Sequence, residues 1–329
     1  MAATIRDVAH EVGVSASTVS RAFSRPDLVD AETRTTVLEA AARMRYRPNK
    51  AAQILNTGRT GCMGAVLPDL ENPFFAGILK GAEKEADRLG YQMLVADTSE
   101  DVESELRAVR ALAGRVDGLL LCSPRLDDEV LLQLAEEVRV VLVNRTVGRL
   151  AHVNLDNEGG VRLALRHLAG LGHRQVGYVG GELISRSARR RLETFEQECE
   201  QMGLQICPVG AFPPTFEGGG TAADSVLGSG ATGVVVYNDV MAIGLMNRLL
   251  ALGVRMPERL SVVGIDNVPV SAMVTPALTT VDLPRLEAGR LATELLHRLV
   301  SQPDTQPAEP QLLLPTSLVV RSSTAALAR

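Results

Sequence analysis

The sequence predicts an α/β protein with a small three-helix unit at its N-terminus and two doubly wound parallel α/β lobes behind it. Residues 4–46 carry apolar residues at helical spacing. From Gly61 onward, short apolar runs alternate with amphipathic stretches, which is the pattern of strands alternating with helices. The chain has 329 residues, more than one ordinary core needs, so we expect several domains.

The N-terminal unit is predicted to hold three short helices. Thr4 can cap the first helix, which Gly13 ends, while Ser15 and Asp30 can cap the second and third. Residues 48–59 follow as a linker with one short helical stretch, a hinge helix that is too short to be stable alone in water.

The rest of the chain is predicted to form the two lobes. The expected strands are Cys62–Leu67, Gln92–Ala96, Gly118–Leu121, Val140–Val143, Val176–Val179, Gly233–Val236 and Ser261–Ile265. The expected helices are Pro73–Leu89, Val102–Ala113, Asp128–Glu137, Glu158–Leu171, Ala188–Met202, Gly219–Leu227 and Val240–Leu252. Short continuous apolar strands between helices indicate parallel sheets covered on both faces. We expect the lobes to divide near residues 145–157, and tail strands at Gln311–Leu314 and Ser317–Arg321 to cross between them.

The expected domains are therefore residues 1–47, 48–59 and 60–329, and charge is distributed unevenly among them. Residues 1–59 hold nine Lys and Arg against six Asp and Glu, a balance of +3. The remainder holds 25 against 33, a balance of −8, which gives the net charge of −5. A positively charged N-terminal module joined to an acidic remainder suggests that the N-terminal module binds phosphate groups.

No catalytic, metal or cofactor site is predicted. The four cysteines form no CxxC pair, the five histidines do not cluster, and no GxSxG, P-loop, HExxH or strand-following GxGxxG signature occurs. The N-terminus lacks the apolar segment of a signal peptide, and no apolar run is long enough to span a bilayer. These absences argue against two classes, an enzyme and an exported transport binding protein, and we expect a cytoplasmic protein.

Residues 5–21 have the pattern of a helix-turn-helix, which places its second helix in the major groove of DNA. Ser15, Thr18 and Ser20 suit contacts with phosphates, helped by the free N–H groups at a helix start. Arg21 can pair with guanine in bidentate geometry. From spacing alone, a three-helix bundle that contacts only protein is the alternative.

These residues also resemble the headpiece of the lactose repressor/galactose repressor family of transcriptional regulators. The likeness lies in Thr-Ile-Arg-Asp-Val-Ala at 4–9, Val-Gly-Val-Ser at 12–15, Thr-Val-Ser-Arg at 18–21, Thr-Arg at 33–34 and Arg-Tyr-Arg-Pro-Asn at 45–49. It continues in Asn72–Phe75, Asp117–Leu119, Leu171–His173, Asn238–Asp239 with Met241–Ala242, and Val262–Asp266. The resemblance implies a ligand-responsive regulator that binds double-stranded, near-palindromic operator DNA.

The resemblance also implies which residues contact DNA. The set is Ser15, Ala16, Ser17, Thr18, Ser20, Arg21, Asn49, Ala52 and Leu55. The hinge helices of two protomers would pair in the minor groove, where Leu55 would wedge between bases and Ala52 would allow close approach. An ordinary apolar linker residue is the alternative for Leu55. Because one half-site is too weak to be specific, we expect at least a homodimer, with Ile78, Leu79, Ala82 and Ala86 as candidate interface residues.

The core resembles periplasmic sugar-binding proteins of the ribose-binding type, with a pocket between the lobes. The candidate effector residues are Asn72, Phe74, Phe75, Asn144, Arg145, Arg191, Asn238 and Asp266, which lie where a strand ends or a helix begins. Phe74 and Phe75 can stack on a sugar ring, with packing between helix and sheet as the alternative. Asn144 and Leu283 stand where many relatives have Asp and Gln, so a pentose, hexose, sugar acid or nucleoside all stay open. We expect a derepressor, and a corepressor is the alternative.

Overall fold

The computed structural model describes residues 3–24, 28–46, 59–302 and 311–327. The chain divides into two compact units, Met1–Thr60 and Gly61–Arg329. The predicted hinge helix, with Asn49, Ala52 and Leu55, lies outside the described residues.

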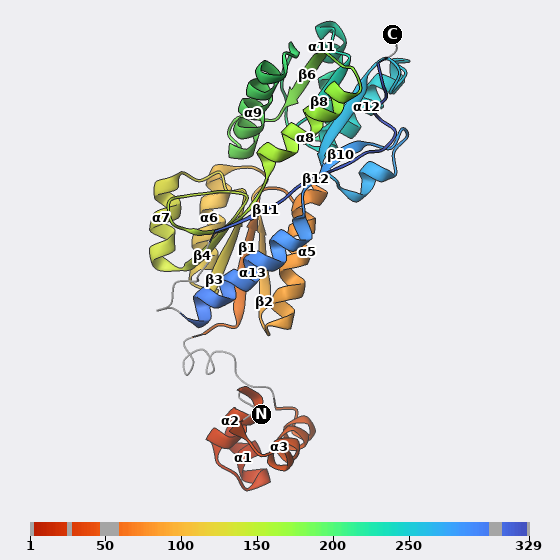
Figure 1. The fold of residues 1–329 in the computed structure, drawn as a ribbon. Helices are drawn as coiled ribbons and strands as arrows, with labels where there is room; N and C mark the ends of the chain where they lie inside the picture. Colours follow the sequence, from red (N-terminus) through yellow and green to blue (C-terminus); the bar gives the residue numbers. More distant parts are fainter. Residues whose placement is uncertain (1–2, 25–27, 47–58, 303–310, 328–329) are drawn as a thin grey trace. The chain divides into compact units, whose positions relative to one another are not determined.

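The first unit contains the three expected helices, α1 (Ile5–Val12), α2 (Ala16–Ser24) and α3 (Ala31–Arg43) (Figure 1). Thr4 caps α1 in a reciprocal arrangement, since its Oγ1 accepts from the Asp7 N–H and its own N–H donates to Asp7 Oδ2 at 2.8 Å. Gly13 ends α1 with φ 72°, a left-handed conformation that glycine adopts without steric cost. The chain therefore turns sharply between α1 and α2.

A small apolar core holds these helices together. Val8, Val19 and Val37, one from each helix, are fully buried. Phe23 meets Tyr46 edge to face, with ring centroids 5.9 Å apart. With Val19 turned inward, the opposite side of α2 is left at the surface.

The second unit consists of two lobes, each built on a six-stranded sheet (Figure 1). The first sheet contains β1 (Cys62–Leu67), β2 (Gln92–Asp97), β3 (Gly118–Cys122), β4 (Arg139–Val143), β5 (Ala151–Leu155) and β11 (Gln311–Leu314), in the order β11-β5-β4-β3-β1-β2 and with parallel pairing throughout. Its helices are α5 (Pro73–Arg88), α6 (Val102–Ala113), α7 (Asp128–Glu137) and α13 (Arg285–Ser301).

The second sheet contains β6 (Gln175–Gly180), β7 (Gln205–Ala211), β8 (Gly233–Val236), β9 (Ser261–Asp266), β10 (Thr279–Asp282) and β12 (Ser317–Val319), in the order β12-β10-β9-β8-β6-β7. β12 pairs antiparallel with β10, and the other pairs are parallel. The accompanying helices are α8 (Asn157–Gly170), α9 (Arg186–Met202), α10 (Phe216–Thr221), α11 (Ala223–Ser229), α12 (Asp239–Ala251) and the 3-10 helix η2 (Pro269–Ala272).

The predicted fold class is confirmed, with five elements added and one corrected. The strands β5, β7 and β10, the helix α13 and the 3-10 helix η2 were not predicted. The single helix expected over 219–227 is wrong, because two short helices, α10 and α11, meet at Ala222. The tail crosses as expected, since β11 belongs to the first sheet and β12 to the second.

The chain passes between the lobes three times: after β5, between β10 and α13, and between β11 and β12. One apolar cluster continues through both lobes, from Phe75 and Ile78 on α5 to Val161 on α8 and Ile265 on β9. Separate clusters lie under α6 and α7 and under α10 to α12. Each lobe thus has its own sheet, while three crossover segments of the chain and one shared apolar core join the lobes. No helix in the described part of the chain is long and apolar enough to cross a membrane.

Candidate functional site

The start of α2 presents small hydroxyl side chains at the surface of the first unit. Ser15 Oγ accepts from the Thr18 N–H at 3.1 Å and lies 2.7 Å from Ser17 Oγ and 2.8 Å from Thr18 Oγ1. Ser20 and Arg21 are exposed on the following turn. Ala16 is half-buried and packs against the core of the three helices, so it is less available than the exposed Ser15, Ser17, Ser20 and Arg21.

The electrostatics of this surface favour an anionic partner. The first turn of α2 contains no acidic residue, so the positive end of the helix dipole is not neutralised there. Arg21 adds a guanidinium in the last turn. The surface therefore combines free donors, small hydroxyl groups and one long cation, as a major-groove reading helix requires.

A pocket between the two lobes collects polar side chains at the carboxyl ends of the strands. It is lined by Asn72, Phe74, Phe75, Glu100, Ser123, Arg125, Asn144, Ser187, Arg191, Pro214, Tyr237, Asn238 and Asp266. Seven of the eight predicted effector residues are in this central pocket, and Arg145 is not. The free volume is about 20 Å³, room for roughly one water molecule. The side chains of the site therefore fill it.

Arg191 is a buried and firmly held charge of the central pocket. Its side chain is only 3% exposed, and its Nε and Nη2 donate to Asn157 Oδ1 at 3.0 and 2.8 Å. A further nitrogen donates to the Tyr237 carbonyl, and the guanidinium lies 5.0 Å from the centroid of the Tyr237 ring. Asp266 Oδ1 is 3.7 Å from Arg191 Nη2, so a carboxylate and a guanidinium face each other at the pocket.

Asp266 is buried and held in an unusual conformation. Its φ of 118° is one that residues other than glycine rarely adopt. Burial raises the pKa of the Asp266 carboxyl to about 7, against the opposing effect of Arg191 and Arg285. The neighbouring Asp239 is fully buried, and burial, followed by the charge of Asp266, raises its pKa well above the ordinary value. Such strain and desolvation are typical of residues kept for function.

Two of the three predicted asparagines are helix caps at the wall of the pocket. Asn72 Oδ1 accepts from the Phe74 N–H at 3.0 Å, and Asn238 Oδ1 accepts from the Met241 N–H at 2.8 Å. Phe74 and Phe75 are both buried, with ring centroids 5.1 Å apart in an edge contact. These aromatic rings pack in the core and also line the pocket, so the predicted packing is confirmed and stacking on a sugar ring stays a prediction.

Arg145 lies in a different environment from the other candidates. Its Nη1 donates to the Pro124 carbonyl at 2.7 Å, and its Nη2 donates to the Leu126 carbonyl at 3.1 Å and to Asp128 Oδ1 at 2.6 Å. The guanidinium thus closes the loop between β3 and α7.

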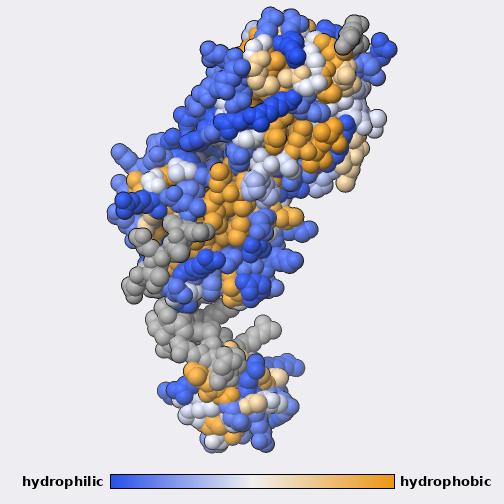
Figure 2. Space-filling model, viewed as in Figure 1, coloured by the Kyte–Doolittle hydropathy of each residue, from blue (hydrophilic) through white to orange (hydrophobic). Residues whose placement is uncertain are grey.

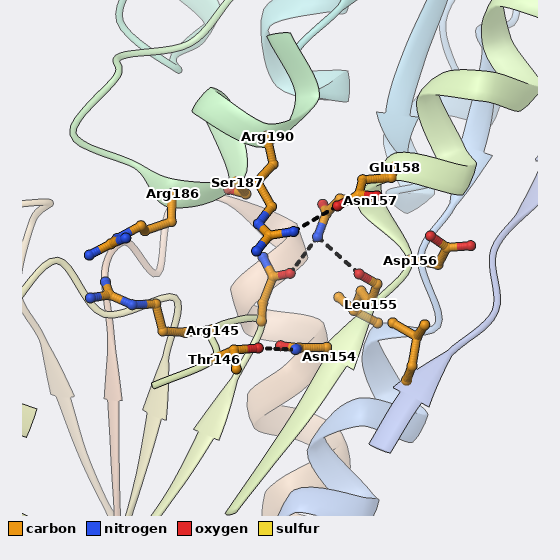
Figure 3. Close-up of a pocket in the computed structure, with 12 residues that line it drawn as sticks. Arg145, Thr146, Asn154, Leu155, Asp156, Asn157, Glu158, Arg186, Ser187 and Arg190 are labelled. Carbon is orange, nitrogen blue, oxygen red and sulfur yellow. Dashed lines mark hydrogen bonds and ion pairs between the residues drawn. The ribbon is translucent and has the colours of Figure 1, made fainter. Parts of the chain in front are cut away.

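Arg145 lines an outer pocket next to the central one, with a volume of about 270 Å³ (Figure 3). The lining residues are Asn144, Arg145, Thr146, Asn154, Leu155, Asp156, Asn157, Glu158, Arg186, Ser187, Arg190 and Leu313. Asn144 and Ser187 line both pockets, so the two are neighbouring parts of one cleft. Asn157 Nδ2 donates to Asn144 Oδ1 at 2.7 Å, which ties α8 to the end of β4.

Several residues of the cleft were not predicted. Ser123 and Arg125 directly follow β3, and Arg125 Nε donates to Glu100 Oε2 at 2.9 Å. The rule that ligands meet the carboxyl ends of parallel strands points to this loop. Asn157 follows β5, a strand that was itself not predicted, and Tyr237 ends the run before Asn238. The outer pocket depends on the spacing of two helices, which no local pattern gives.

A helix-turn-helix headpiece joined to a two-lobed α/β core with a polar cleft defines a bacterial transcriptional regulator. The family described as "Bacterial regulatory proteins, lacI family" matches residues 4–49, and "Periplasmic binding protein-like domain" matches residues 165–324. The regulator GalS of Salmonella typhimurium is 34% identical over 300 residues, covering 89% of this chain and 88% of that protein. The ribose operon repressor of Halalkalibacterium halodurans is 32% identical over 327 residues, covering 98% and 97%.

Among solved structures, the Lac repressor dimer bound to operator and the anti-inducer ONPF has a TM-score of 0.87 and 30% identity, covering 99% of this chain and 100% of that one. The chain belongs to the lacI family of transcriptional regulators.

Proposed function

We propose that this protein is a repressor that binds near-palindromic operator DNA as a homodimer and is released by a small sugar or sugar derivative bound between its lobes. The proposed binding of an effector rests on the burial of two charged residues. Arg191 and Asp266 are 3% and 4% exposed, yet both border a pocket lined from both lobes. Buried charges are costly unless partners satisfy them. Adjacent sugar hydroxyl groups donate to a carboxylate and accept from a guanidinium, so a polyol suits this pair.

The DNA-binding part rests on α2 and on the relatives. Ser15, Ser17, Thr18 and Ser20 would contact phosphates or base edges, and Arg21 would read one base pair. The similar Lac repressor structure is a dimer bound to operator. For the hinge residues Asn49, Ala52 and Leu55, which lie outside the described residues, the same contacts are proposed by resemblance.

The candidate interface on α5 is only partly available. Ile78, Ala82 and Ala86 are each 1% exposed, because α13 packs along this side of α5. Those three side chains are therefore excluded from an interface, while Leu79 is partly buried and stays a candidate. Apolar surface does gather over the α5 and α13 side of the first lobe (Figure 2). Leu286 on α13 is 51% exposed and Leu313 on β11 is 65% exposed, and apolar patches of this kind mark protein interfaces.

The proposed switch couples the cleft to the hinge. A ligand that binds one arrangement of the lobes better than the other shifts the protein toward that arrangement, by at most its difference in affinity. A change in lobe arrangement that separates two hinge segments would prevent them from sharing one minor groove. The same geometry with the opposite preference gives a corepressor. We propose that the protein performs this regulation in the cytoplasm, without catalysing a reaction and without a cofactor.

Arg21→Ala tests the DNA-reading role. We expect it to lose discrimination at one base pair of each half-site by about 1–3 kcal/mol, because a bidentate contact with guanine is lost. The wild-type protein first selects a duplex from a random pool. The measurement is then a mobility shift with variants of that duplex, each of which carries one base-pair substitution. Arg43→Ala is the control, since it removes the same charge from α3, where Arg43 forms an exposed 3.7 Å ion pair with Glu11. Equal base preferences in wild type and Arg21→Ala would contradict the assignment.

A further inference from the structure

The outer pocket is the most open part of the cleft, and its walls are rich in guanidinium groups. It offers about 270 Å³ where the central pocket offers about 20 Å³. Arg145, Arg186 and Arg190 line it, and Figure 3 shows the guanidinium groups of Arg145 and Arg186 side by side, with Arg190 reaching toward Asn157 and Glu158. An effector that enters the cleft therefore meets these groups beside the site that holds its hydroxyls.

The positive charge of this wall lies at one trio of residues, because Arg190 and its neighbour Arg162 each have a carboxylate partner, Glu158 and Glu198. Asp128 Oδ1 serves two guanidinium groups, Arg145 at 2.6 Å and Arg186 at 3.2 Å, so this trio keeps one positive charge. Glu158 accepts from Arg190 at 2.7 Å and also lies 3.6 Å from Arg162. Glu158 and Asp156 are the carboxylates that line the pocket, and the Oδ1 of Asp156 accepts from the Gly159 N–H at 2.8 Å.

Two arginines are free to turn toward a ligand. The side chains of Arg186 and Arg190 are 48% and 65% exposed, and surface ion pairs contribute little to stability. Exchanging such a pair for a contact with a bound anion is therefore inexpensive. Both residues lie in the first turns of α9, which starts at Arg186 with no acidic residue in its first turn, so the helix dipole adds to the attraction.

We propose that the effector carries an oxyanion, a phosphate or a carboxylate, that binds in the outer pocket against Arg186 and Arg190. Its hydroxyl-bearing part then lies against Arg191 and Asp266 in the central pocket, which must widen from its free volume of about 20 Å³ to hold it. This inference rests on the proposed function, because it names the ligand class of the same cleft. Sugar phosphates and sugar acids fit the description, and a neutral monosaccharide leaves the outer pocket unused.

The test uses the full-length protein and three single variants on one helix. Arg186→Gln and Arg190→Gln each remove a guanidinium from the outer pocket. Arg189→Gln removes the same charge from an exposed residue that lines neither pocket, and it is the matched control. Binding is measured by calorimetric titration in chloride buffer. The ligands are inorganic phosphate, the neutral sugars glucose and ribose, and the charged sugars glucose 6-phosphate, ribose 5-phosphate and gluconate.

We expect millimolar inorganic phosphate to bind wild type and Arg189→Gln, and at least one charged sugar to bind tenfold or more tightly than its neutral parent. Arg186→Gln and Arg190→Gln should each lose tenfold or more of the affinity for the charged sugar, and less than twofold for a neutral one. Tighter binding of the sugar phosphates would identify the oxyanion as a phosphate, and tighter binding of gluconate would identify it as a carboxylate. The inference is overturned if the four proteins bind phosphate and the charged sugars alike, or if none of them binds either.

A parallel mobility shift separates this inference from the proposed function. If neutral sugars release the selected DNA while the anions do not bind, the repressor function stands and the anion pocket is wrong. If a charged sugar binds through Arg186 and Arg190 yet leaves DNA affinity unchanged, the pocket stands and the effector role of the cleft is wrong.

Discussion

At the scale of single residues, Asp266 combines two costs that the fold must offset. Its backbone has φ 118° and its carboxyl is buried, and its charge in turn raises the pKa of the buried Asp239. Asp239 is satisfied within the lobe, since it accepts from Thr280 Oγ1 at 2.5 Å and from the Val268 N–H at 2.9 Å. Asp266 has the 3.7 Å ion pair with Arg191. Because Asp266 lies at the cleft, hydroxyl groups of a ligand can form hydrogen bonds with its carboxyl and offset the cost of burying it.

Asp266→Asn should change how stability depends on pH. Burial raises the pKa of Asp266 from 3.8 to about 7, so between these values the folded protein holds a proton that the unfolded chain has released. The free energy of unfolding of the ligand-free protein therefore falls as pH rises through this window, and it levels off above pH 7. The contribution is on the order of a few kcal/mol. Urea unfolding at pH 5, 6, 7 and 8 should show a smaller fall in Asp266→Asn.

The exposed Asp224→Asn is the control for this prediction and should keep the wild-type slope. Equal slopes in wild type and Asp266→Asn would show that the carboxyl is ionised throughout. Binding gives a second readout, because a neutral amide cannot replace a carboxylate that accepts from ligand hydroxyls.

Arg145 and Arg191 show which parts of the site a sequence can specify. Both follow the family pattern, and both are buried. Arg191 faces the central pocket, whereas Arg145 binds the Pro124 and Leu126 carbonyls. The sequence locates each arginine at the end of an element, but the direction of a long side chain depends on which acceptors the folded loop offers. Several of those acceptors are backbone carbonyls, which carry no sequence signature, and the others, Asp128 and Asn157, are distant in the sequence.

At the scale of elements, the pair α5 and α13 depends on glycines at its crossing. A Cβ on Gly289 would lie 1.9 Å from the Ile78 carbonyl oxygen, and a Cβ on Gly81 would lie 2.0 Å from the Leu286 carbonyl oxygen. Backbone meets backbone there, so no side chain can move aside. The helices can therefore approach closely only because neither position has a side chain.

Gly289→Ala should destabilise the first lobe by about 1–3 kcal/mol or more, since the added methyl group forces the two helices apart. The measurement is urea unfolding followed by circular dichroism. Gly170→Ala is the matched control, because Gly170 ends α8 and a Cβ there meets nothing within 4 Å. That variant should be neutral or slightly stabilising, as alanine is a better helix former than glycine. Equal stability of the two variants would show that the crossing is not tight.

The elements that the sequence did not predict differ in how much signal they carry. β7 contains Pro208 and Gly210, and β10 is half threonine, so neither has a continuous apolar run. Such strands form because the sheet beside them offers hydrogen bonds, which is a tertiary effect. In α13, by contrast, buried residues such as Ala288, Ala292 and Leu295 recur at helical spacing, so the signal is present although we did not predict the helix.

At the scale of the whole molecule, three groups of contacts bridge the lobes beside the cleft. Asp128 of the first lobe lies 3.2 Å from Arg186 Nη2 of the second, and Asn144 accepts from Asn157 at 2.7 Å. Arg285 Nη1 on α13 donates to the backbone carbonyls of Asp266 and Asn267 at 3.1 and 2.8 Å. Each contact couples a residue of the cleft to the relative position of the lobes. A ligand that changes one of them therefore acts on the whole core.

If the cleft and the DNA surface are coupled, each must act on the other to the same extent. An effector that lowers operator affinity by some factor requires operator DNA to lower effector affinity by the same factor, and coupling of about 1–3 kcal/mol, or 5–150-fold, is typical. The measurement is calorimetric titration of the ligand identified above into the protein, free and saturated with selected duplex. Arg191→Ala should weaken the ligand in both titrations while leaving operator affinity without ligand unchanged, because Arg191 lies in the central pocket. Tighter binding in the presence of duplex would reverse the sign and make the ligand a corepressor. Equal binding in both states would show that the cleft does not control DNA binding.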